Sequence, residues 1–424
     1  MNILLVTPRV LYPVLSGAEL RMYNLFMAVR QRHTIHWLGH ARQEMIAPAI
    51  EHLSSRFASV ELFATDSRPM QQRSRSTMDR FMEIWRAPID YFDYFNCDGY
   101  WDDVQRAILR RIDESTIDVV YMFGWGMKRY MDPVTKIPVV FDIVDNPVVA
   151  TARRIRETKR LVEKARVVKE WMMMRRMVTR ELAKSRDIIM VSYQDAEALR
   201  PLCPQTSVTV VPNGVDSEFY RPGASRNTER PVLIFTGVMS YGPNVSAALY
   251  FTRSVYPLIR KEIPDISLLI VGRYPSKEVA ALHSAELGIT VTGGVDDIRE
   301  YFDRAMIYVC PIRSGAGIKN KILEAWAMQK PVVATSMACE GIQVSPGEDV
   351  MVADDAAEFA RQVVHLVRDR ELRERLAANG RRKVERQYSW DAGAHMVEEV
   401  MSRRVAEYRA GKLAPAADPS SARH

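Results

Sequence analysis

The chain has 424 residues, of which 47% are hydrophobic and 26% charged, and its formal net charge is +7. This length exceeds what one hydrophobic core usually organises, so two domains are predicted, and the composition excludes a largely disordered chain. The apolar runs are short and bounded by Pro, Asp or Gly, which excludes a transmembrane helix, and no secretory signal follows Met1. We therefore expect a cytoplasmic protein.

The sequence offers no metal-ligating pattern. Its cysteines show no CxxC or Cys/His spacing, so neither a zinc site nor a disulfide framework is expected. An early group of histidines has no accompanying carboxylates or cysteines, and we expect core and surface histidines there. These residues are Cys97, Cys203, Cys310, Cys339, His33, His36 and His40.

The first half of the chain repeats an apolar strand, a turn and an amphipathic segment. The predicted strand 2–7 precedes a Pro- and Gly-containing loop and a helical stretch with Leu20, Tyr23 and Met27 at helix period. Strands alternating with helices imply a parallel sheet covered on both faces. Further strands are predicted at 34–38, 60–63, 119–123, 139–142, 187–192 and 208–211.

A polar, turn-rich break from Pro212 to Gly223 comes next, and the pattern then restarts. A helix is predicted at 244–261, and strands at 231–236, 266–271, 307–309 and 331–334. The fold class is therefore α/β, with two Rossmann-like, doubly wound domains. In such sheets ligands bind beyond the carboxyl ends of the strands. With two such domains, we expect these ends to face one another across a cleft that holds the ligand.

The predicted domains are an N-terminal acceptor-side domain and a C-terminal donor domain. A C-terminal helix is expected to return to the N-terminal domain, and the Ala-, Pro- and Ser-rich end is expected to be a flexible tail. The corresponding ranges are 1–222, 223–384, 385–411 and 412–424.

The segment from Arg313 to Glu324 carries the clearest chemistry. It follows an apolar strand and enters a helix, and its glycines let the backbone approach a bulky anion. The first NH groups of the helix have no partner within it, so a diphosphate fits there. Lys321 and Glu324 are three residues apart and share a helix face, which places an ammonium for phosphate beside a carboxylate for ribose hydroxyls. Arg313 adds a guanidinium suited to phosphate.

With this loop, the sequence resembles the GT-B glycosyltransferases, and among them the retaining enzymes of family 4 (group 1). The resemblance covers nearly the whole chain, and the linker 211–216 and the donor loop are its most specific parts. The stretch from Gly237 to Asn244, together with the Gly-Ile-Lys-Asn-Lys loop, is similar to sugar transferases associated with bacterial exopolysaccharide gene clusters.

The resemblance implies transfer of a sugar, with retention, from a nucleoside-diphosphate sugar to a glycan, lipid-linked or other small acceptor. It implies no cofactor, because protein cations and the helix dipole, not a metal, stabilise the diphosphate. Glu324 takes the place of the family's ribose ligand. Gly17 lies in the N-terminal loop where donor phosphate and acceptor approach. The other donor-binding residues expected are Gly237, Gly315, Gly317, Ile318, Lys319 and Asn320.

Three positions depart from the family. Ala316 replaces the first glutamate, and the stretch 239–244 lacks the usual Arg and Lys. We therefore assign the diphosphate charge to Arg313, Lys319 and Lys321, with Arg313 and Lys321 as catalytic residues. No histidine stands near 140–145, where Asp142 and Asp145 occur. Asp145 is a candidate to orient or deprotonate an acceptor hydroxyl; the alternative is an Asx turn before Pro147.

Between Arg153 and Arg186 there are thirteen Lys or Arg against four Glu. This basic, partly helical stretch suits an anionic membrane surface or a phosphorylated acceptor, which would make the protein peripheral on the inner face of the cytoplasmic membrane. The alternative is a solvated helix with Glu and Arg paired at helical spacing.

Other classes of function were weighed. A sugar-nucleotide epimerase would use the same diphosphate site without an acceptor, but no His and carboxylate pair suits its proton chemistry. A membrane-surface or nucleic-acid-binding adaptor would use the basic stretch on a degenerate fold, whereas the transferase needs no nucleic acid. A dinucleotide-dependent oxidoreductase is disfavoured, because no G-x-G-x-x-G follows the first strand.

Overall fold

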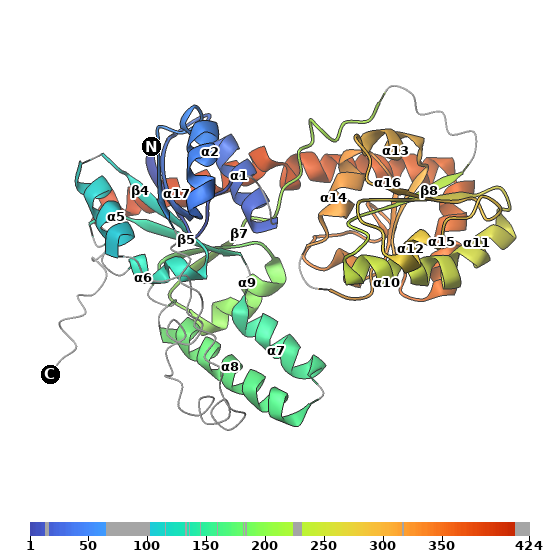
Figure 1. Cartoon of the computed structure of the whole chain (residues 1–424), viewed down its shortest axis with the longest axis horizontal. Helices are drawn as coiled ribbons and strands as arrows, with labels where there is room; N and C mark the ends of the chain where they lie inside the picture. The colour runs from blue at the N-terminus through green and yellow to red at the C-terminus, as the bar shows by residue number, and fades with distance from the viewer. Residues whose placement is uncertain are drawn as a thin grey trace. The chain divides into compact units, whose positions relative to one another are not determined.

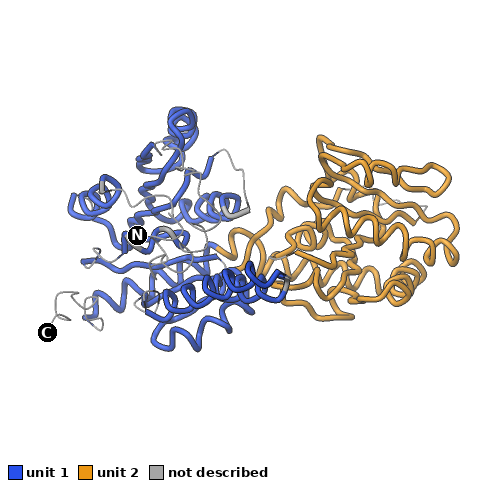
Figure 2. Tube along the Cα trace, turned by 60° about the horizontal axis from the view of Figure 1, so that its bottom comes forward, with its two compact units in different colours: residues 1–211, 394–424 blue, residues 212–393 orange. Residues whose placement is uncertain are grey.

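The computed structural model describes two compact units, which Figure 2 distinguishes by colour. Unit 1 comprises residues 1–211 and 394–424, and unit 2 comprises residues 212–393. The described residues are 1–12, 17–64, 102–114, 116–131, 134, 136–144, 146–158, 160–180, 182, 185–223, 231–315 and 318–411. The predictions on Cys97, Asp145, Ala316, Gly317 and the tail 412–424 lie outside these residues.

Unit 1 contains a parallel sheet in which the described strands follow the order β3-β2-β1-β4-β5-β6-β7. Leu4 in β1 lies between His36 of β2 and Val120 of β4. The predicted strands are confirmed, with ends shifted by a few residues. Their bounds are β1 (Asn2–Thr7), β2 (Thr34–Ala41), β3 (Ser59–Ala64), β4 (Val119–Phe123), β5 (Val139–Val144), β6 (Asp187–Met190) and β7 (Ser207–Val210).

Two hydrophobic clusters cover the faces of this sheet, as successive side chains of a strand point to opposite faces. Leu5 belongs to one cluster with Phe26, and Val6 to the other with Met122. The helices of unit 1 lie on both faces (Figure 1). They include α1 (Gly17–Val29), α2 (Gln43–Ser54), α5 (Asp102–Glu114), α6 (Lys128–Met131), α7 (Pro147–Glu157), α8 (Leu161–Arg180), α9 (Tyr193–Leu199) and the 3-10 turns η1 (Trp125–Met127) and η3 (Arg200–Leu202).

The last helix, α17 (Trp390–Arg409), starts in unit 2 and continues in unit 1 from Ala394. Val397 and Met401 are fully buried in the core of unit 1, and Arg403 Nη2 lies 2.8 Å from Asp187 Oδ1 of β6. The C-terminal helix therefore packs against unit 1 and contributes to its core.

The boundaries differ from the predicted ones, since the chain divides after Val211 and not after residue 222. Val215 N donates to Tyr388 O at 2.7 Å, and the Val215 side chain is buried in the core of unit 2. Because of these contacts the segment that follows Val211 belongs to unit 2, although its polar, turn-rich sequence is typical of a linker between domains.

A buried ion pair links α1 to the end of β5. Arg21 Nη2 lies 3.1 Å from Asp142 Oδ2, both side chains are fully buried, and Tyr121 donates its hydroxyl to Asp142 at 2.7 Å. Asp142 Oδ1 also accepts from the backbone NH of Val144, whose φ of 61° is unusual for a β-branched residue. Asp142 is therefore part of the framework of unit 1.

Unit 2 contains a second parallel sheet, with the described strands in the order β10-β9-β8-β11-β12-β13. Four of its strands were predicted; β10 and β13 were not. The bounds are β8 (Val232–Thr236), β9 (Ser267–Val271), β10 (Ile289–Gly293), β11 (Ile307–Cys310), β12 (Val332–Ala334) and β13 (Met351–Val352).

The predicted helix 244–261 is present as α10 (Gly242–Tyr250) and α11 (Tyr256–Glu262), joined by the π-helical turn η4 (Phe251–Val255). Phe235 of β8 and Trp326 lie in one core that extends to the later helices. The remaining helices are α12 (Lys277–Ala280), α13 (Arg299–Arg304), α14 (Asn320–Ala327), α15 (Ala356–Arg368), α16 (Arg370–Lys383) and the turns η5 (Met337–Cys339) and η6 (Val384–Tyr388).

Candidate functional site

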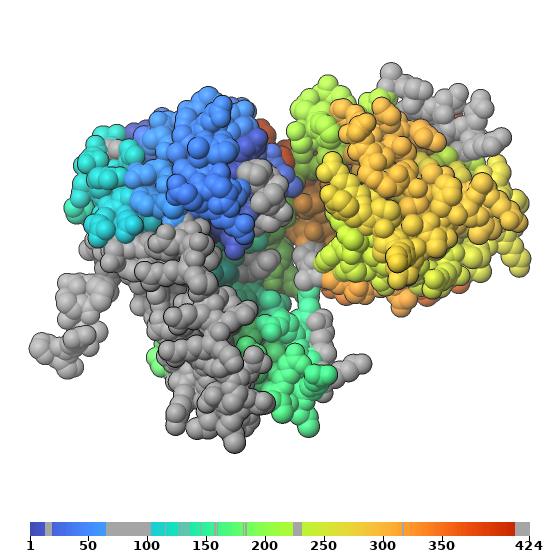
Figure 3. All heavy atoms as spheres, in the orientation of Figure 1, coloured from blue at the N-terminus to red at the C-terminus, as the bar shows by residue number. Residues whose placement is uncertain are grey.

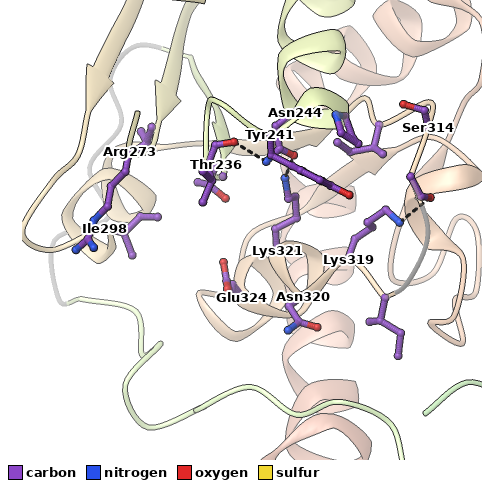
Figure 4. A pocket seen from close by; sticks show the side chains of 18 of the residues that line it. Thr236, Tyr241, Asn244, Arg273, Ile298, Ser314, Lys319, Asn320, Lys321 and Glu324 are labelled. Carbon is purple, nitrogen blue, oxygen red and sulfur yellow. Dashed lines mark hydrogen bonds between the residues drawn. The ribbon is translucent and has the colours of Figure 1, made fainter. Parts of the chain in front are cut away.

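A pocket of about 460 Å³ lies in unit 2, beyond the carboxyl ends of β8, β9 and β11. Its volume is in the range of small-molecule sites. Figure 4 shows Arg273 and Ile298 toward one end of it, Ser314 and Lys319 toward the other, and Lys321 and Glu324 between them. The lining residues are Tyr220, Thr236, Gly237, Val238, Tyr241, Pro243, Asn244, Val271, Gly272, Arg273, Ile298, Ile312, Ser314, Gly315, Ile318, Lys319, Asn320, Lys321 and Glu324.

The predicted donor loop forms one wall of the pocket. It leaves β11 at Cys310, passes Gly315 at a φ of 102°, and enters α14 at Asn320. Such a φ favours glycine, and a Cβ on Gly315 would also lie 3.1 Å from Pro243. Among the residues that the structure describes, no side chain caps the start of α14, so the NH groups of its first turn and the positive end of its dipole remain suited to an anion.

Two glycines allow the loops after β8 and β9 to approach each other. Gly237 N donates to Val271 O at 3.1 Å, and a Cβ on Gly272 would lie 1.6 Å from Gly237 O. A side chain at Gly272 would therefore force the two loops apart. A Cβ on Gly237 would lie 2.6 Å from Asn244 Nδ2 and 2.9 Å from Lys321 Nζ, so this glycine also makes room for polar groups of the pocket.

Lys321 is held in place by Asn244 in the first turn of α10 and by Phe235 of β8. Its Nζ donates to Asn244 Oδ1 at 2.6 Å and lies 4.8 Å from the centroid of the Phe235 ring. Asn244 Nδ2 in turn donates to Val238 O at 3.0 Å, which fixes the orientation of the amide. Burial lowers the pKa of the Lys321 ammonium from 10.5, against the opposing effects of Cys310 and Glu324.

Glu324 lies one turn after Lys321 on the pocket face of α14, in accordance with their spacing of three residues. Burial raises the pKa of its carboxyl from 4.5, and the positive charge of Lys321 partly opposes this effect. An acceptor-only carboxylate in this position is well placed to receive hydrogen bonds from two vicinal hydroxyls of a ligand.

The residues that connect the loop to α14 add polar groups. Lys319 Nζ donates to Gly315 O at 3.2 Å, and both residues line the pocket with Ile318. Asn320 Oδ1 is buried and has no hydrogen-bond partner among the described residues, although buried polar atoms are usually paired. The described residues therefore bring Lys319, Asn320 and Lys321 to one pocket.

The sequence analysis did not assign several polar side chains that line the pocket, among them Asn244, Arg273 and Tyr241. Arg273 follows Val271 and Gly272, so its place after the end of β9 was a usable signal. The pocket thus has a cation on the β9 side, even though the stretch 239–244 contains none.

Two predicted site residues lie elsewhere. Arg313 is exposed, its guanidinium stacks on the Tyr250 ring at 4.4 Å, and it does not line the pocket, although its neighbours Ile312 and Ser314 do. Gly17 is the first residue of α1 in unit 1.

Asp145 and Gly317 lie outside the described residues. Next to Asp145, Asn146 is the N-cap of α7, and its side chain accepts from Val148 N at 3.0 Å. Pro147 occupies the first turn of that helix, as proline often does. The capping residue before α7 is therefore Asn146.

The described residues contain no group of three or more His, Cys, Asp or Glu side chains arranged to hold a metal ion. The histidines singled out above take structural positions: His36 Nδ1 lies 2.9 Å from Ser59 Oγ, and His40 is buried. In the part of the chain that the structure describes, no helix combines the length and apolar character required to span a bilayer.

Residues 230–369 match the family model described as "Glycosyl transferases group 1". The chain is 27% identical over 241 residues to the GDP-mannose-dependent alpha-(1-6)-phosphatidylinositol monomannoside mannosyltransferase of Mycobacterium tuberculosis, which covers 51% of this chain and 62% of the relative. It is 31% identical over 138 residues to the lipopolysaccharide core biosynthesis glycosyltransferase LpsE of Rhizobium meliloti, which covers 31% of this chain and 40% of the relative.

The chain thus matches less than two thirds of the length of either curated relative. Among solved structures, the fold is similar to that of HepE from Anabaena in complex with UDP and glucose. The TM-score is 0.58 at 14% identity, and the match covers 95% of this chain and 100% of HepE. The predicted fold class is therefore confirmed: two parallel α/β units with the fold of GT-B glycosyltransferases.

Proposed function

Because residues 230–369 form a group 1 glycosyltransferase domain, we propose that the protein transfers a sugar from a nucleoside-diphosphate sugar to an acceptor, with retention at the anomeric carbon. The observation that carries this proposal is the pocket at the start of α14, where an uncapped helix N-terminus, two lysines and a buried carboxylate meet. These groups match the charges and hydroxyls of a nucleoside diphosphate.

We place the diphosphate against the NH groups of Ile318 to Asn320 and the ammonium groups of Lys319 and Lys321. Glu324 then accepts from the ribose hydroxyls, and the base lies toward Arg273 and Ile298. The order of these groups along the pocket supports this orientation (Figure 4). The exposed Arg313, stacked on Tyr250, contributes less to this site than the sequence suggested.

The chemistry of this site is electrostatic. When the bond between the sugar and the diphosphate breaks, negative charge grows on the leaving phosphate, and preorganised cations and helix NH groups stabilise it. Lys321 is preorganised by Asn244 and Phe235, so it needs little rearrangement during the reaction. We propose that these groups act in place of a metal ion, and that no cofactor is required.

We assign recognition of the acceptor to unit 1, with Gly17 and Asp145 as candidate residues. The acceptor classes are a glycan, a lipid-linked molecule or another small molecule, in the synthesis of an exopolysaccharide or other cell-surface glycan. The names of the two curated relatives, a phosphatidylinositol mannoside mannosyltransferase and a lipopolysaccharide core transferase, support this class. We place the protein in the cytoplasm, at the inner face of the membrane.

Calorimetric titration with UDP-, GDP-, dTDP- and ADP-sugars tests the proposal. The correct donor should bind and raise the melting temperature by mass action. Binding should be weakened in Lys321→Ala and Glu324→Ala and should persist in EDTA. A donor that binds equally well to both variants, or that binds only with a divalent metal, would contradict the assigned site. Incorporation of solvent deuterium into the donor sugar without any acceptor would indicate an epimerase instead.

A further inference from the structure

Helices α7 and α8 form a hairpin that projects from the sheet of unit 1 (Figures 1 and 3). One face of α8 is buried, with Met173, Met174 and Met177 among its buried residues. Across the hairpin, Arg154 Nη1 lies 2.6 Å from Glu170 Oε1. The two helices therefore support each other, with the last turn of α7 and the first turn of α8 at the outer end of the hairpin.

Two neighbouring aliphatic side chains are exposed at this outer end. Leu161 and Val162, the first residues of α8, are 84% and 68% exposed. Met172 is 54% exposed and follows Leu161 by three helical turns, so these two side chains lie on the same face of α8. Single exposed hydrophobic residues are common, whereas this adjacent pair at the end of a projecting hairpin is a candidate contact surface.

The exposed apolar pair lies on a hairpin with an excess of positive charge. From Arg153 to Arg180 the sequence holds eleven Lys or Arg and three Glu. Arg156 and Arg160 are exposed next to the pair, and Glu170 is buried against Arg154. Glu163 is the exposed carboxylate of the first turn of α8. The outer end of the hairpin therefore presents aliphatic groups beside the exposed Arg156 and Arg160, on a hairpin with a net positive charge.

This combination distinguishes between polyanionic partners. A nucleic acid would be attracted by the same cations, but it offers phosphates and base rings and no medium into which Leu161 and Val162 can be transferred from water. An anionic bilayer offers both negative headgroups for the arginines and a hydrocarbon boundary for the aliphatic side chains. The pairing of charge and aliphatic exposure thus favours a lipid surface.

We propose that the α7–α8 hairpin is a membrane-docking element that inserts Leu161 and Val162 into an anionic bilayer surface. Arg156, Arg160 and the other cations of the hairpin contact the lipid headgroups. This proposal rests on unit 1 and is independent of the donor chemistry proposed for the pocket of unit 2. A hairpin held at the membrane would keep the protein close to a lipid-linked acceptor.

The test is flotation of the purified full chain with vesicles made of equal parts phosphatidylcholine and phosphatidylglycerol, with pure phosphatidylcholine vesicles as the neutral comparison. The double variant Leu161→Ser/Val162→Ser should lose about tenfold or more in vesicle affinity. Its matched control is Leu287→Ser, which removes another exposed aliphatic side chain, 45% exposed, from unit 2.

The double variant Arg156→Glu/Arg160→Glu should lose more than about fivefold in affinity for each residue, because each reversal removes a cation and adds an anion, and the loss should be larger at low salt. Its matched control is Arg106→Glu/Arg370→Glu, at side chains that are 74% and 80% exposed on other helices. All four variants should retain the melting temperature of the parent chain, because the substituted side chains are exposed. They should also retain its donor affinity, because none of these residues lines the pocket.

Three outcomes would overturn the proposal: vesicle affinity that both hairpin variants retain, equal binding to neutral vesicles, or no vesicle binding by the parent chain. Binding to RNA that requires the arginines and is indifferent to Leu161→Ser/Val162→Ser would assign the surface to nucleic acid. Lys321→Ala should float with anionic vesicles like the parent chain, so failure of the donor site and failure of this proposal give different results.

Discussion

Asn244 and Lys321 are far apart in the sequence, yet their side chains meet inside the pocket of unit 2, with Lys321 Nζ 2.6 Å from Asn244 Oδ1. Asn244 is itself 7% exposed and donates to Val238 O. The amide therefore connects the loop after β8 to the ammonium that we assign to the donor phosphates.

Replacing Asn244 by Leu should lower donor affinity about tenfold or more, because the ammonium loses a charge-assisted hydrogen bond and its fixed position. Asn244→Asp keeps the shape but adds a negative charge beside the phosphate site, and should also weaken donor binding. Calorimetric titration measures both effects. Asn379→Leu, on α16 outside the pocket, is the control, and donor affinity unchanged in both Asn244 variants would contradict a positioning role.

Lys321→Ala should reduce turnover about one hundredfold or more, because a preorganised cation near the leaving diphosphate is lost. Initial rates with the true donor and acceptor measure this loss. Lys277→Ala, at an exposed residue of α12, should leave the rate unchanged. Near-normal sugar transfer by the Lys321 variant would remove the central residue of the proposed site.

Glu324→Ala should act mainly on donor binding. The carboxylate is assigned to the ribose, which does not change during the reaction, so KM for the donor should rise about tenfold while kcat changes less. Steady-state kinetics at varied donor concentration separate the two parameters. A large fall in kcat with KM unchanged would show that Glu324 acts on the reacting sugar instead.

Donor binding should depend on pH at both ends of the range. It requires ionised Glu324, whose pKa is raised from 4.5, and protonated Lys321, whose pKa is lowered from 10.5. Affinity should therefore fall as pH decreases through a value above 4.5, and fall again as pH increases through a value below 10.5. Titrations across this range check both limbs, and Glu324→Gln should abolish the acid limb.

The same raised pKa has a consequence for stability. Between 4.5 and the raised pKa of Glu324 the folded chain binds more protons than the unfolded chain, so the contribution of this group to stability is present at low pH and is lost as pH rises through the folded pKa. Unfolding of the parent chain and Glu324→Gln at matched pH values isolates this contribution.

Asp142→Ala should destabilise unit 1 by about 3–5 kcal/mol, because it leaves the guanidinium of Arg21 buried without its carboxylate. The melting temperature of the variant should fall well below that of Asp103→Ala, which removes a carboxylate that is 63% exposed. Equal melting temperatures for the two variants would show that the buried pair contributes little.

Much of the fold could be predicted because its central strands are short apolar runs bounded by Pro, Asp or Gly. The strands that were missed are at the edges of the second sheet: β10 has two threonines among five residues, and β13 has only two residues. Such strands form because they pair with a neighbouring strand, and the local sequence gives little indication of this pairing.

In the site, Lys321 and Glu324 could be predicted because their relationship is local, three residues apart on one helix. Asn244 could not, because the fold brings the first turn of α10 to the pocket from a distant part of the sequence, whereas the place of Arg273 just after the end of β9 was a usable signal. Arg313 was assigned to the phosphates because its guanidinium suits phosphate and because the stretch 239–244 lacks a cation. The local sequence did not show that its guanidinium stacks on Tyr250 of α10.

Helix α17 begins in unit 2 and ends in unit 1, so the backbone passes from one unit to the other twice, after Val211 and after Gly393. A single proteolytic cut therefore cannot yield both units intact. A fragment that stops at Val211 would lack Val397 and Met401 and would expose the apolar surface that they cover. An autonomous form of unit 1 would need residues 394–411 joined back to it through an artificial linker.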